Sequence, residues 1–445
     1  MTPGCSRSLA AASLLLLTAC GTLSADDRLH LATFDSYWAT LRDRYPYFGN
    51  KAIDWQAFGK QYRAAVPFAR QPIDFYHQLA GMLAELHDNH VSLSLPDALF
   101  AAEAPRLTRL DALEFFRLVR IQGGLYVESW PIGEEPTPPA HLAADLQALP
   151  EIVAVEGAPA TSSLLNVLFT GPAGSAAGLL LRWHDGTLTH HALHRPTEPA
   201  KRRLIVTAPA APATRRGPVT FDVRDGVGVL RIASFAMSDA DTWYAACDAA
   251  IDAAIAHGGG LVVDVRGNSG GDLSAAMRAL SRFLTEPTAM VSDPEIRSWL
   301  FGLLRVENFH SFVTEPRAPR FPGQVVVLAD GSSASATEHF ARMMQLQGAA
   351  VVGETTRGIE AIMHEFAGPD GSTLRFGEQL LLDEHGRRLQ GEGVHPDIAL
   401  PLQWDAVRQL GYDGARAAWD DELFAAARRE LTRREWAQQA RASRR

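Results

Sequence analysis

The chain has 445 residues, a length that predicts two or three globular domains rather than a single core. Its net charge of −9 argues against nucleic acid as a general partner, because phosphate binding needs a basic surface. Three cysteines do not make a disulfide framework, and no Cys/His spacing indicates a metal site, so no metal or other cofactor is expected.

Residues 1–19 are typical of a signal peptide, because their apolar run, 9–17, is too short to cross a bilayer as a permanent helix. Residues 17–20 (LTAC) resemble a bacterial lipobox. This resemblance implies lipidation of Cys20, and the following Gly21 favours a lipoprotein of the outer membrane that faces the periplasm. An ordinary signal cleaved nearby is the alternative.

Residues 26–100 predict a small helical domain. Large apolar side chains recur there at helical spacing in three stretches, and prolines separate the stretches. The last helix is expected to end near Leu86, where the pattern changes to the alternation of a strand. We expect the aromatic residues of this segment to form a core rather than a ligand site.

Residues 101–200 predict a β-rich module that closes with a hairpin around the turn pair Asp185-Gly186. The module resembles a PDZ-like domain, which implies binding of chain ends by strand addition. A structural module that only shapes a cleft is the alternative. The expected strands are 125–130, 152–155, 179–183 and 188–193.

After a Pro/Ala-rich linker at 208–213, residues 218–403 alternate between strands and helices. The strands are continuous apolar runs, which is typical of a buried parallel sheet and predicts an α/β fold. Residues 286–320 are expected to be irregular, as a mobile flap would be, and 404–445 to form a helical tail. The expected strands are 227–233, 260–265, 325–329 and 350–352, and the expected helices are 238–257, 273–285 and 336–347.

Two turns of this α/β segment indicate chemistry. Residues 331–338 (GSSASATE) lie between a strand and a helix, the context in which a serine hydroxyl is exposed on a sharp turn as a nucleophile. Residues 261–272 (LVVDVRGNSGGD) form a strand and a Gly-rich turn whose N–H groups can point outward together, as an oxyanion hole requires. A turn merely rich in N-capping residues is the alternative for the first segment.

These two turns, in this order, resemble the family of C-terminal-processing (tail-specific) and tricorn-like serine peptidases. Further matching blocks lie at 227–235, 351–356 and 393–398, and with weaker matches the resemblance covers most of 26–403. It implies a crotonase-like β/α superhelix core that carries the N-terminal helical domain and the PDZ-like module. It also implies hydrolysis of peptide bonds through an acyl-enzyme, with a peptide or protein as substrate.

The resemblance assigns the nucleophile to Ser335, the middle serine of the family's Ser-Ala-Ser-Ala-Ser-Glu motif, with Ser332 and Ser333 as alternatives. The tail-specific branch uses a downstream lysine as base. Here Ile359 stands at that position and no lysine follows the serine, so a Ser-Lys dyad of that type is excluded. Arg357 cannot substitute, because a guanidinium stays protonated in proteins.

The tricorn-like branch instead takes a histidine from nearer the N-terminus, and residues 86–91 (LHDNHV) match its Leu-x-Asp-x-His segment. This assigns the general base to His90, with a packed or capping histidine as the alternative. The branch's orienting glutamate corresponds to Gln390, Glu392 is displaced from it by two positions, and Asn89 stands where a serine would help, so the tetrad is only partly preserved.

The oxyanion hole is expected to combine the N–H of Ala336 with that of Gly270 or Gly271. The alternative function is a catalytically inactive, peptidase-like protein that binds peptides or hydrophobic ligands. The missing lysine and Gln390 motivate that alternative. Retention of the whole small-residue turn argues against it, because an inactive scaffold has little need for an exposed serine there.

Overall fold

The structure is a computed structural model that describes residues 23–48, 53–99, 107–110, 117–121, 124–130, 133, 136, 149–160, 163–197, 217–292, 295–299, 304–308, 311–383 and 385–442. The signal segment, Cys20 and the linker at 208–213 lie outside these residues. Within them, no helix has both the length and the apolar character needed to cross a membrane, and no cluster of three potential metal ligands occurs.

Three helices form at the N-terminal end, where the helical spacing predicted them. Ser24 and Asp27 form a capping box at the first helix, and Asp54 caps the second through the Ala57 N–H, so polar side chains satisfy the helix ends. Their apolar faces bury a shared core. The helices are α1 (Ala25–Arg44), α2 (Trp55–Ala65) and α3 (Pro72–Ala84).

The next module is an antiparallel sheet in the order β3-β4-β5-β8-β9, with β6 paired to β5. The predicted hairpin is present as β8 and β9, and Gly186 adopts φ +88° at its turn. The PDZ-like identity of the module stays a prediction. The strands are β3 (Arg117–Ile121), β4 (Gly124–Ser129), β5 (Glu151–Val155), β6 (Ala158–Pro159), β8 (Ala176–Arg182) and β9 (Leu188–His194).

The α/β core confirms the predicted fold class. Its sheet has the order β10-β11-β12-β17-β18-β21, and every neighbouring pair except β10 and β11 is parallel. Alternate side chains face opposite layers, so Val263 packs against one set of helices and Val262 against another. The strands are β10 (Val219–Arg224), β11 (Val227–Ile232), β12 (Leu261–Asp264), β17 (Val325–Ala329), β18 (Ala350–Gly353) and β21 (Ile398–Ala399).

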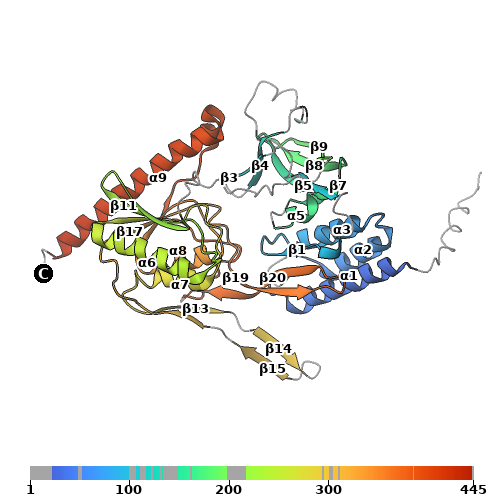
Figure 1. Ribbon diagram of the computed structural model, residues 1–445, viewed down its shortest axis with the longest axis horizontal. Helices are drawn as coiled ribbons and strands as arrows, with labels where there is room; N and C mark the ends of the chain where they lie inside the picture. The colour runs from blue at the N-terminus through green and yellow to red at the C-terminus, as the bar shows by residue number, and fades with distance from the viewer. Residues whose placement is uncertain are drawn as a thin grey trace, which may run out of the picture.

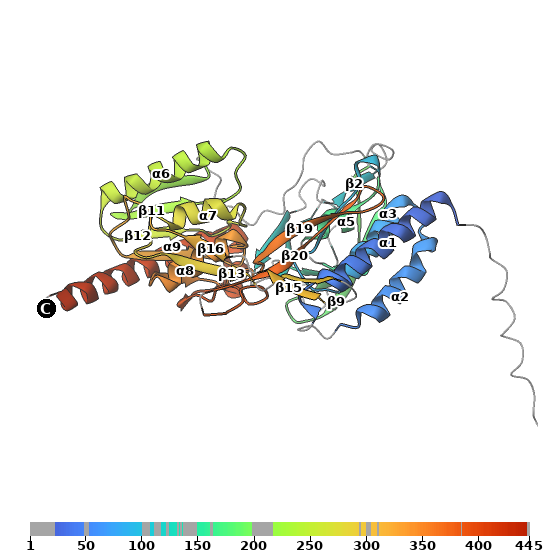
Figure 2. The ribbon, with the colours of Figure 1, turned by 90° about the horizontal axis from the view of Figure 1, so that it is seen from below.

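Helices cover both faces of this sheet (Figure 2). The face of Val263 carries three helices, and the face of Val262 carries the long C-terminal helix. That last helix is interrupted at Gly411, where φ is +69°, and it extends away from the core at its C-terminal end (Figure 1). The helices are α6 (Ala240–His257), α7 (Leu273–Leu280) and α8 (Ala336–Leu346) on the first face and α9 (Trp404–Ala442) on the second.

The expectation that residues 286–320 are irregular was wrong, because the segment contains four strands. The first and last form an antiparallel pair, and the middle two form a hairpin of their own. The partner that completes this sheet, β20 (Thr373–Leu382), lies far along the chain, where local pattern does not reveal it. The four strands are β13 (Thr288–Ser292), β14 (Glu295–Trp299), β15 (Leu304–Asn308) and β16 (Ser311–Thr314).

One long hairpin connects the two ends of the molecule. It consists of β19 (Ala361–Ala367) and β20, which lie between the α/β core and the N-terminal helices in Figure 1. One end of β20 pairs with β1 (Ser92–Ser94), and the other pairs with β13. Phe376 of β20 is buried in the same cluster as α1 and α3. The hairpin thereby brings the turn that carries His90 close to the α/β core.

Candidate active site

Ser335 occupies the N-cap of α8, directly after the turn that follows β17. Its backbone has φ +56° and ψ −126°, a conformation that costs a residue with a side chain about 1–3 kcal/mol. A strained strand-to-helix turn of this kind presents a serine hydroxyl above the helix. The residue is half-buried, so its side chain retains access to solvent.

The alternative serines of the same turn are buried. Ser333 is fully buried, and its Oγ donates to the Val265 carbonyl oxygen at 3.0 Å and accepts from the Asp330 N–H at 3.1 Å. Ser332 is also buried. Both buried serines therefore have a structural role in the turn, and Ser335 is the solvent-accessible serine of residues 331–338.

Glu338 fixes the serine turn to the neighbouring loop. Its Oε2 accepts hydrogen bonds from the N–H groups of Ser335 at 2.9 Å and Ile359 at 2.8 Å. Its Oε1 accepts from the Thr356 hydroxyl and from the Gly358 N–H, each at 2.6 Å. Burial raises the pKa of this fully buried carboxyl, and these hydrogen bonds oppose the shift.

Sequence reasoning did not assign Glu338 this role. The signal that could have found it is the Ser-x-x-Glu spacing at the start of a helix, which is a capping-box pattern. That pattern predicts the bond from Glu338 to the Ser335 N–H. It does not predict the bonds to the loop at 356–359, because those depend on how the chain returns after β18.

The Gly-rich turn lies directly against Ser335. A side chain on Gly270 would come within 2.7 Å of the Ser335 Cβ and 3.1 Å of the Ala336 nitrogen. Gly270 adopts φ +98° and Gly271 φ +135°, values that favour glycine. The absence of side chains therefore allows the two turns to meet.

The two glycines that the sequence left open as oxyanion donors are not equivalent. The Gly270 N–H donates to the Asn268 Oδ1 at 2.9 Å, so it is already used. Among the described residues, no acceptor bonds the N–H of Gly271 or of Ala336. The geometry therefore favours these two N–H groups as the pair that would stabilise an oxyanion, each donor contributing roughly 3–4 kcal/mol.

His90 and Gln390 meet around the carboxylate of Asp88. This carboxylate accepts from the His90 backbone N–H at 2.8 Å, from the Gln390 Nε2 at 3.2 Å and from the Tyr45 hydroxyl at 2.7 Å. Asp88 thus anchors the turn that carries His90. Glu392, the other acid considered for this place, is exposed.

The environment of His90 favours a neutral imidazole. Burial lowers its pKa to about 4, Asp88 and Gln390 act in the opposite direction, and the charge of Arg357 lowers it further. Within the described part of the chain, neither His90 Nδ1 nor Gln390 Oε1 has a partner at hydrogen-bond geometry. The two atoms are those that would join if the amide oxygen accepted the Nδ1 proton.

The structure brings His90 toward Ser335 through intervening loops, without a direct bond. The Gly391 N–H donates to the Gly358 carbonyl oxygen at 2.8 Å, which joins the Gln390 loop to the loop held by Glu338. No hydrogen bond links the side chains of Ser335 and His90 in the described residues. In unliganded enzymes such bonds are often long and tighten only when substrate binds.

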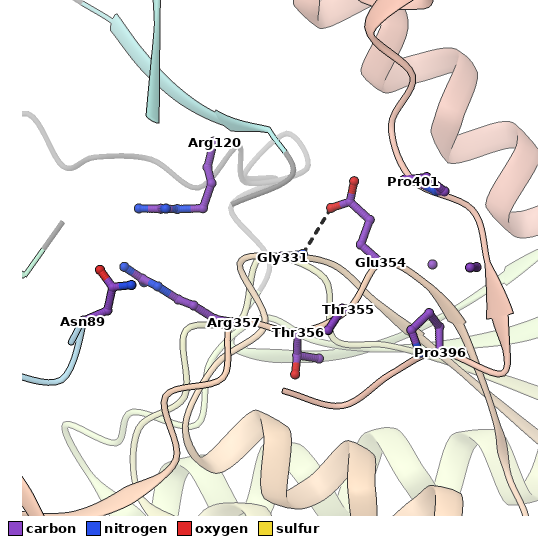
Figure 3. Close-up of a pocket in the computed structure, with 11 residues that line it drawn as sticks. Asn89, Arg120, Gly331, Glu354, Thr355, Thr356, Arg357, Pro396 and Pro401 are labelled. Carbon is purple, nitrogen blue, oxygen red and sulfur yellow. Dashed lines mark hydrogen bonds between the residues drawn. The ribbon is translucent and has the colours of Figure 1, made fainter. Parts of the chain in front are cut away.

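A cavity of about 400 Å³ lies beside the serine turn (Figure 3). Gly331 at the start of that turn contributes to its wall, together with the loop after β18, Asn89 and Arg120 of β3. Glu354 also lines it, and this carboxylate accepts from the N–H groups of Gly331 at 3.2 Å and Leu402 at 2.9 Å. The N-terminal segment, the β-module and the α/β core therefore all contribute to the cavity.

Asp264 and Arg266, at the end of β12, support the Gly-rich turn from behind. Arg266 donates to Asp264 through two nitrogens at 2.8 Å and to Asp420 of α9 at 2.6 Å. Although burial raises the pKa of Asp264, the Arg266 charge outweighs it and holds the pKa at about 2. The pair fixes the turn to the C-terminal helix.

Comparison with known proteins matches two segments of the chain to peptidase families. Residues 226–400 match the family model of peptidase family S41, and residues 30–84 match that of the Tricorn protease C1 domain. The carboxy-terminal processing protease CtpB of Bacillus subtilis (strain 168) is 30% identical over 142 residues, which are 32% of this chain and 28% of CtpB. The matched region thus spans well under half of the length of that relative.

Solved structures show the same fold. Mature CPAF gives a TM-score of 0.59 with 15% sequence identity, covering 89% of this chain and 96% of CPAF. Mature CPAF complexed with lactacystin gives the same TM-score and identity, covering 89% of this chain and 98% of that chain.

The parallel sheet, the strained serine turn and the facing Gly-rich turn define a hydrolase-type site on an α/β fold. The family matches are consistent with the resemblance seen in the sequence. The segments at 226–400 and 30–84 are thus similar to peptidase family S41 and to the Tricorn protease C1 domain, the two kinds of domain found in C-terminal-processing and tricorn-like peptidases.

Proposed function

We propose that the chain is a serine peptidase that hydrolyses peptide bonds through an acyl-enzyme on Ser335. The observation that carries the proposal is the strained Ser335 turn packed against Gly270 of the Gly-rich turn. The N–H groups of Ala336 and of Gly271, the residue after Gly270, have no acceptor among the described residues. A nucleophile and oxyanion donors are the two parts that acyl transfer needs at one place.

In this mechanism His90 is the general base. Its imidazole is neutral at pH 7 because its pKa is lowered to about 4, so it can accept the proton of the Ser335 hydroxyl once the two approach. As the serine attacks the peptide carbonyl, the proton passes to His90 and then to the leaving amine. Gln390 orients the ring through its amide oxygen, while its Nε2 holds Asp88.

The proposal is tested by labelling purified protein with a fluorophosphonate probe, in wild type and in His90→Ala, followed by peptide mapping. We expect the label on Ser335 in wild type and a strong reduction in the variant, because the serine loses its base. Label that persists on Ser335 in the variant would assign the base to another residue. Intact protein that never reacts would instead support a peptidase-like protein that binds peptides or hydrophobic ligands without cleaving them.

The pH dependence of hydrolysis is expected to report His90. Because only the neutral imidazole accepts a proton, kcat/KM should be constant near neutral pH and fall as the pH drops through about 4. In Gln390→Glu, a carboxylate beside the ring stabilises the imidazolium, and the acid limb should move upward by roughly 1–2 pH units.

The matched control is Glu392→Gln, which removes an exposed charge two positions away and should leave the limb in place. Circular dichroism over the same pH range separates titration from acid unfolding. A limb unmoved in Gln390→Glu would show that His90 does not control the rate, whereas a wild-type limb near pH 6.5 would show that burial does not lower the pKa of the base.

A further inference from the structure

A histidine and a glutamate that the proposed mechanism does not use are buried next to the serine turn. His339, one helical turn after Ser335 on α8, is 1% exposed, and Glu360, just after the loop at 356–359, is 2% exposed. His339 Nδ1 and Glu360 Oε1 are 3.6 Å apart, slightly beyond hydrogen-bond length. Within the described ranges, neither ring nitrogen and neither carboxyl oxygen has a hydrogen-bond partner. Because unpaired buried polar atoms are costly, a direct bond between these two side chains is favoured.

The surroundings of both side chains favour their uncharged forms. Burial lowers the pKa of His339 to about 4, and burial together with the Glu338 charge raises the pKa of Glu360 well above its usual value. In the part of the chain that the structure describes, Glu338 is the charged group that acts on Glu360, and Arg357 in turn interacts with Glu338. A protonated Glu360 has an O–H that can donate to the Nδ1 lone pair of a neutral His339.

The two side chains belong to the two segments that catalysis must align. The His339 backbone N–H donates to the Ser335 carbonyl oxygen at 3.2 Å, so His339 closes the first turn of the helix that follows the nucleophile. Glu360 directly precedes β19, the first strand of the long hairpin. The other strand, β20, pairs with β1 just after the turn that carries His90. A bond between His339 and Glu360 would thus join the nucleophile helix to the hairpin that leads to the base.

We infer that Glu360 and His339 form an uncharged, hydrogen-bonded positioning pair that holds the start of α8 against the base of the β19–β20 hairpin. The inference rests on the proposed function. Because both side chains are buried, the pair acts through the placement of Ser335 relative to His90 and not by contact with the substrate. When Glu360 releases its proton to solvent, the O–H···N bond is lost and a buried carboxylate faces the charge of Glu338. Peptide hydrolysis should therefore weaken reversibly at alkaline pH.

The kinetic test measures kcat/KM for a fluorogenic peptide from neutral to alkaline pH in wild type, Glu360→Gln and Glu360→Ala. The Gln amide donates an N–H to His339 and has no proton to lose, so Glu360→Gln should keep the neutral-pH activity and lack the alkaline limb. Glu360→Ala should lower kcat/KM by roughly 10- to 100-fold, mainly through kcat, because the nucleophile is displaced. The matched control is Glu365→Gln, which removes an exposed charge of β19 and should keep the wild-type profile.

Two kinetic results would overturn the inference. If Glu360→Gln is as impaired at neutral pH as Glu360→Ala, the negative charge of the carboxylate is required and the pair is not uncharged. If the alkaline limb is unchanged in Glu360→Gln, the proton of Glu360 does not control the rate. A double-mutant cycle with His339→Ala tests the bond itself, because two residues that act as a unit should lose little more together than either loses alone. Additive losses would show that the two side chains do not interact.

Two measurements without a substrate separate this inference from the proposed function. The infrared difference spectrum between wild type and Glu360→Gln at neutral pH should contain the C=O stretch of a protonated carboxyl group. Because the folded-state pKa of Glu360 is raised, its stabilising contribution is present below the unfolded-state pKa and is lost as the pH rises through the folded-state pKa. In urea denaturation, wild type should therefore lose stability with rising pH more steeply than Glu360→Gln.

A wild type that cleaves nothing but shows both of these signals would reject the peptidase and keep the uncharged pair. Cleavage at Ser335 without the carboxyl stretch, and with equal pH slopes of stability in wild type and Glu360→Gln, would keep the peptidase and reject the pair.

Discussion

Replacing Ser335 with alanine is expected to lower kcat/KM for peptide hydrolysis by about 10³-fold or more. The hydroxyl is the attacking group, and Gly270, which lies against Ser335, has no side chain that could replace it. The turn itself should persist, because its hydrogen bonds run from the Ser335 N–H to Glu338 and from the Glu338 N–H to the Ser335 carbonyl oxygen. Alanine also meets the same backbone strain as serine at φ +56°.

The measurement is initial-rate kinetics on a fluorogenic peptide, together with a urea unfolding curve for each protein. Ser333→Ala is the matched control, since it removes a hydroxyl from the same turn that bonds Val265 and Asp330. We expect Ser333→Ala to lose about 1 kcal/mol of unfolding free energy and to keep the chemistry. Full turnover by Ser335→Ala would reject Ser335 as the nucleophile.

Replacing Glu338 with alanine is expected to lower the free energy of unfolding by about 3 kcal/mol or more. The carboxylate is completely buried and accepts from three backbone N–H groups and one hydroxyl, all of which would lose their acceptor. Because these donors belong to both the serine turn and the loop at 356–359, activity should fall with stability.

Urea denaturation gives the stability, and kinetics well below the unfolding midpoint give the activity of the folded fraction. Glu354→Ala is the comparison, because Glu354 is less buried and accepts only two backbone N–H groups among the described residues. Glu354→Ala should therefore lower the free energy of unfolding by less than Glu338→Ala does. An unchanged urea midpoint in Glu338→Ala would show that water or a local shift satisfies the turn without the carboxylate.

Much of the α/β core follows from the sequence, because its signals are local. Each parallel strand is a continuous apolar run, and each helix keeps its own spacing, so β12, β17 and β18 lie within one or two residues of their predicted bounds. The strands in 286–320 were missed because their sheet is completed by β20, and no local pattern reports a remote partner.

The candidate site also has parts that local sequence predicts and parts that depend on tertiary packing. Ser335 and the Gly-rich turn could be predicted, since each lies within one short segment that joins a strand to a helix. The choice between Gly270 and Gly271 could not, because it depends on which N–H the Asn268 side chain takes. The place of Arg120 in the wall of the cavity could not be predicted either, because it depends on how β3 docks beside the loop that carries Arg357.

The strand β20 has a consequence for how this chain matures. It pairs at one end with β1, from the first quarter of the chain, and its Phe376 completes the core of α1 and α3. Closing such long loops is slow and entropically costly, and the early segment gains its full core only after the late one is present. The turn that carries His90 therefore gains its full set of contacts only after β20 has been synthesised, so a shorter nascent chain lacks a positioned base.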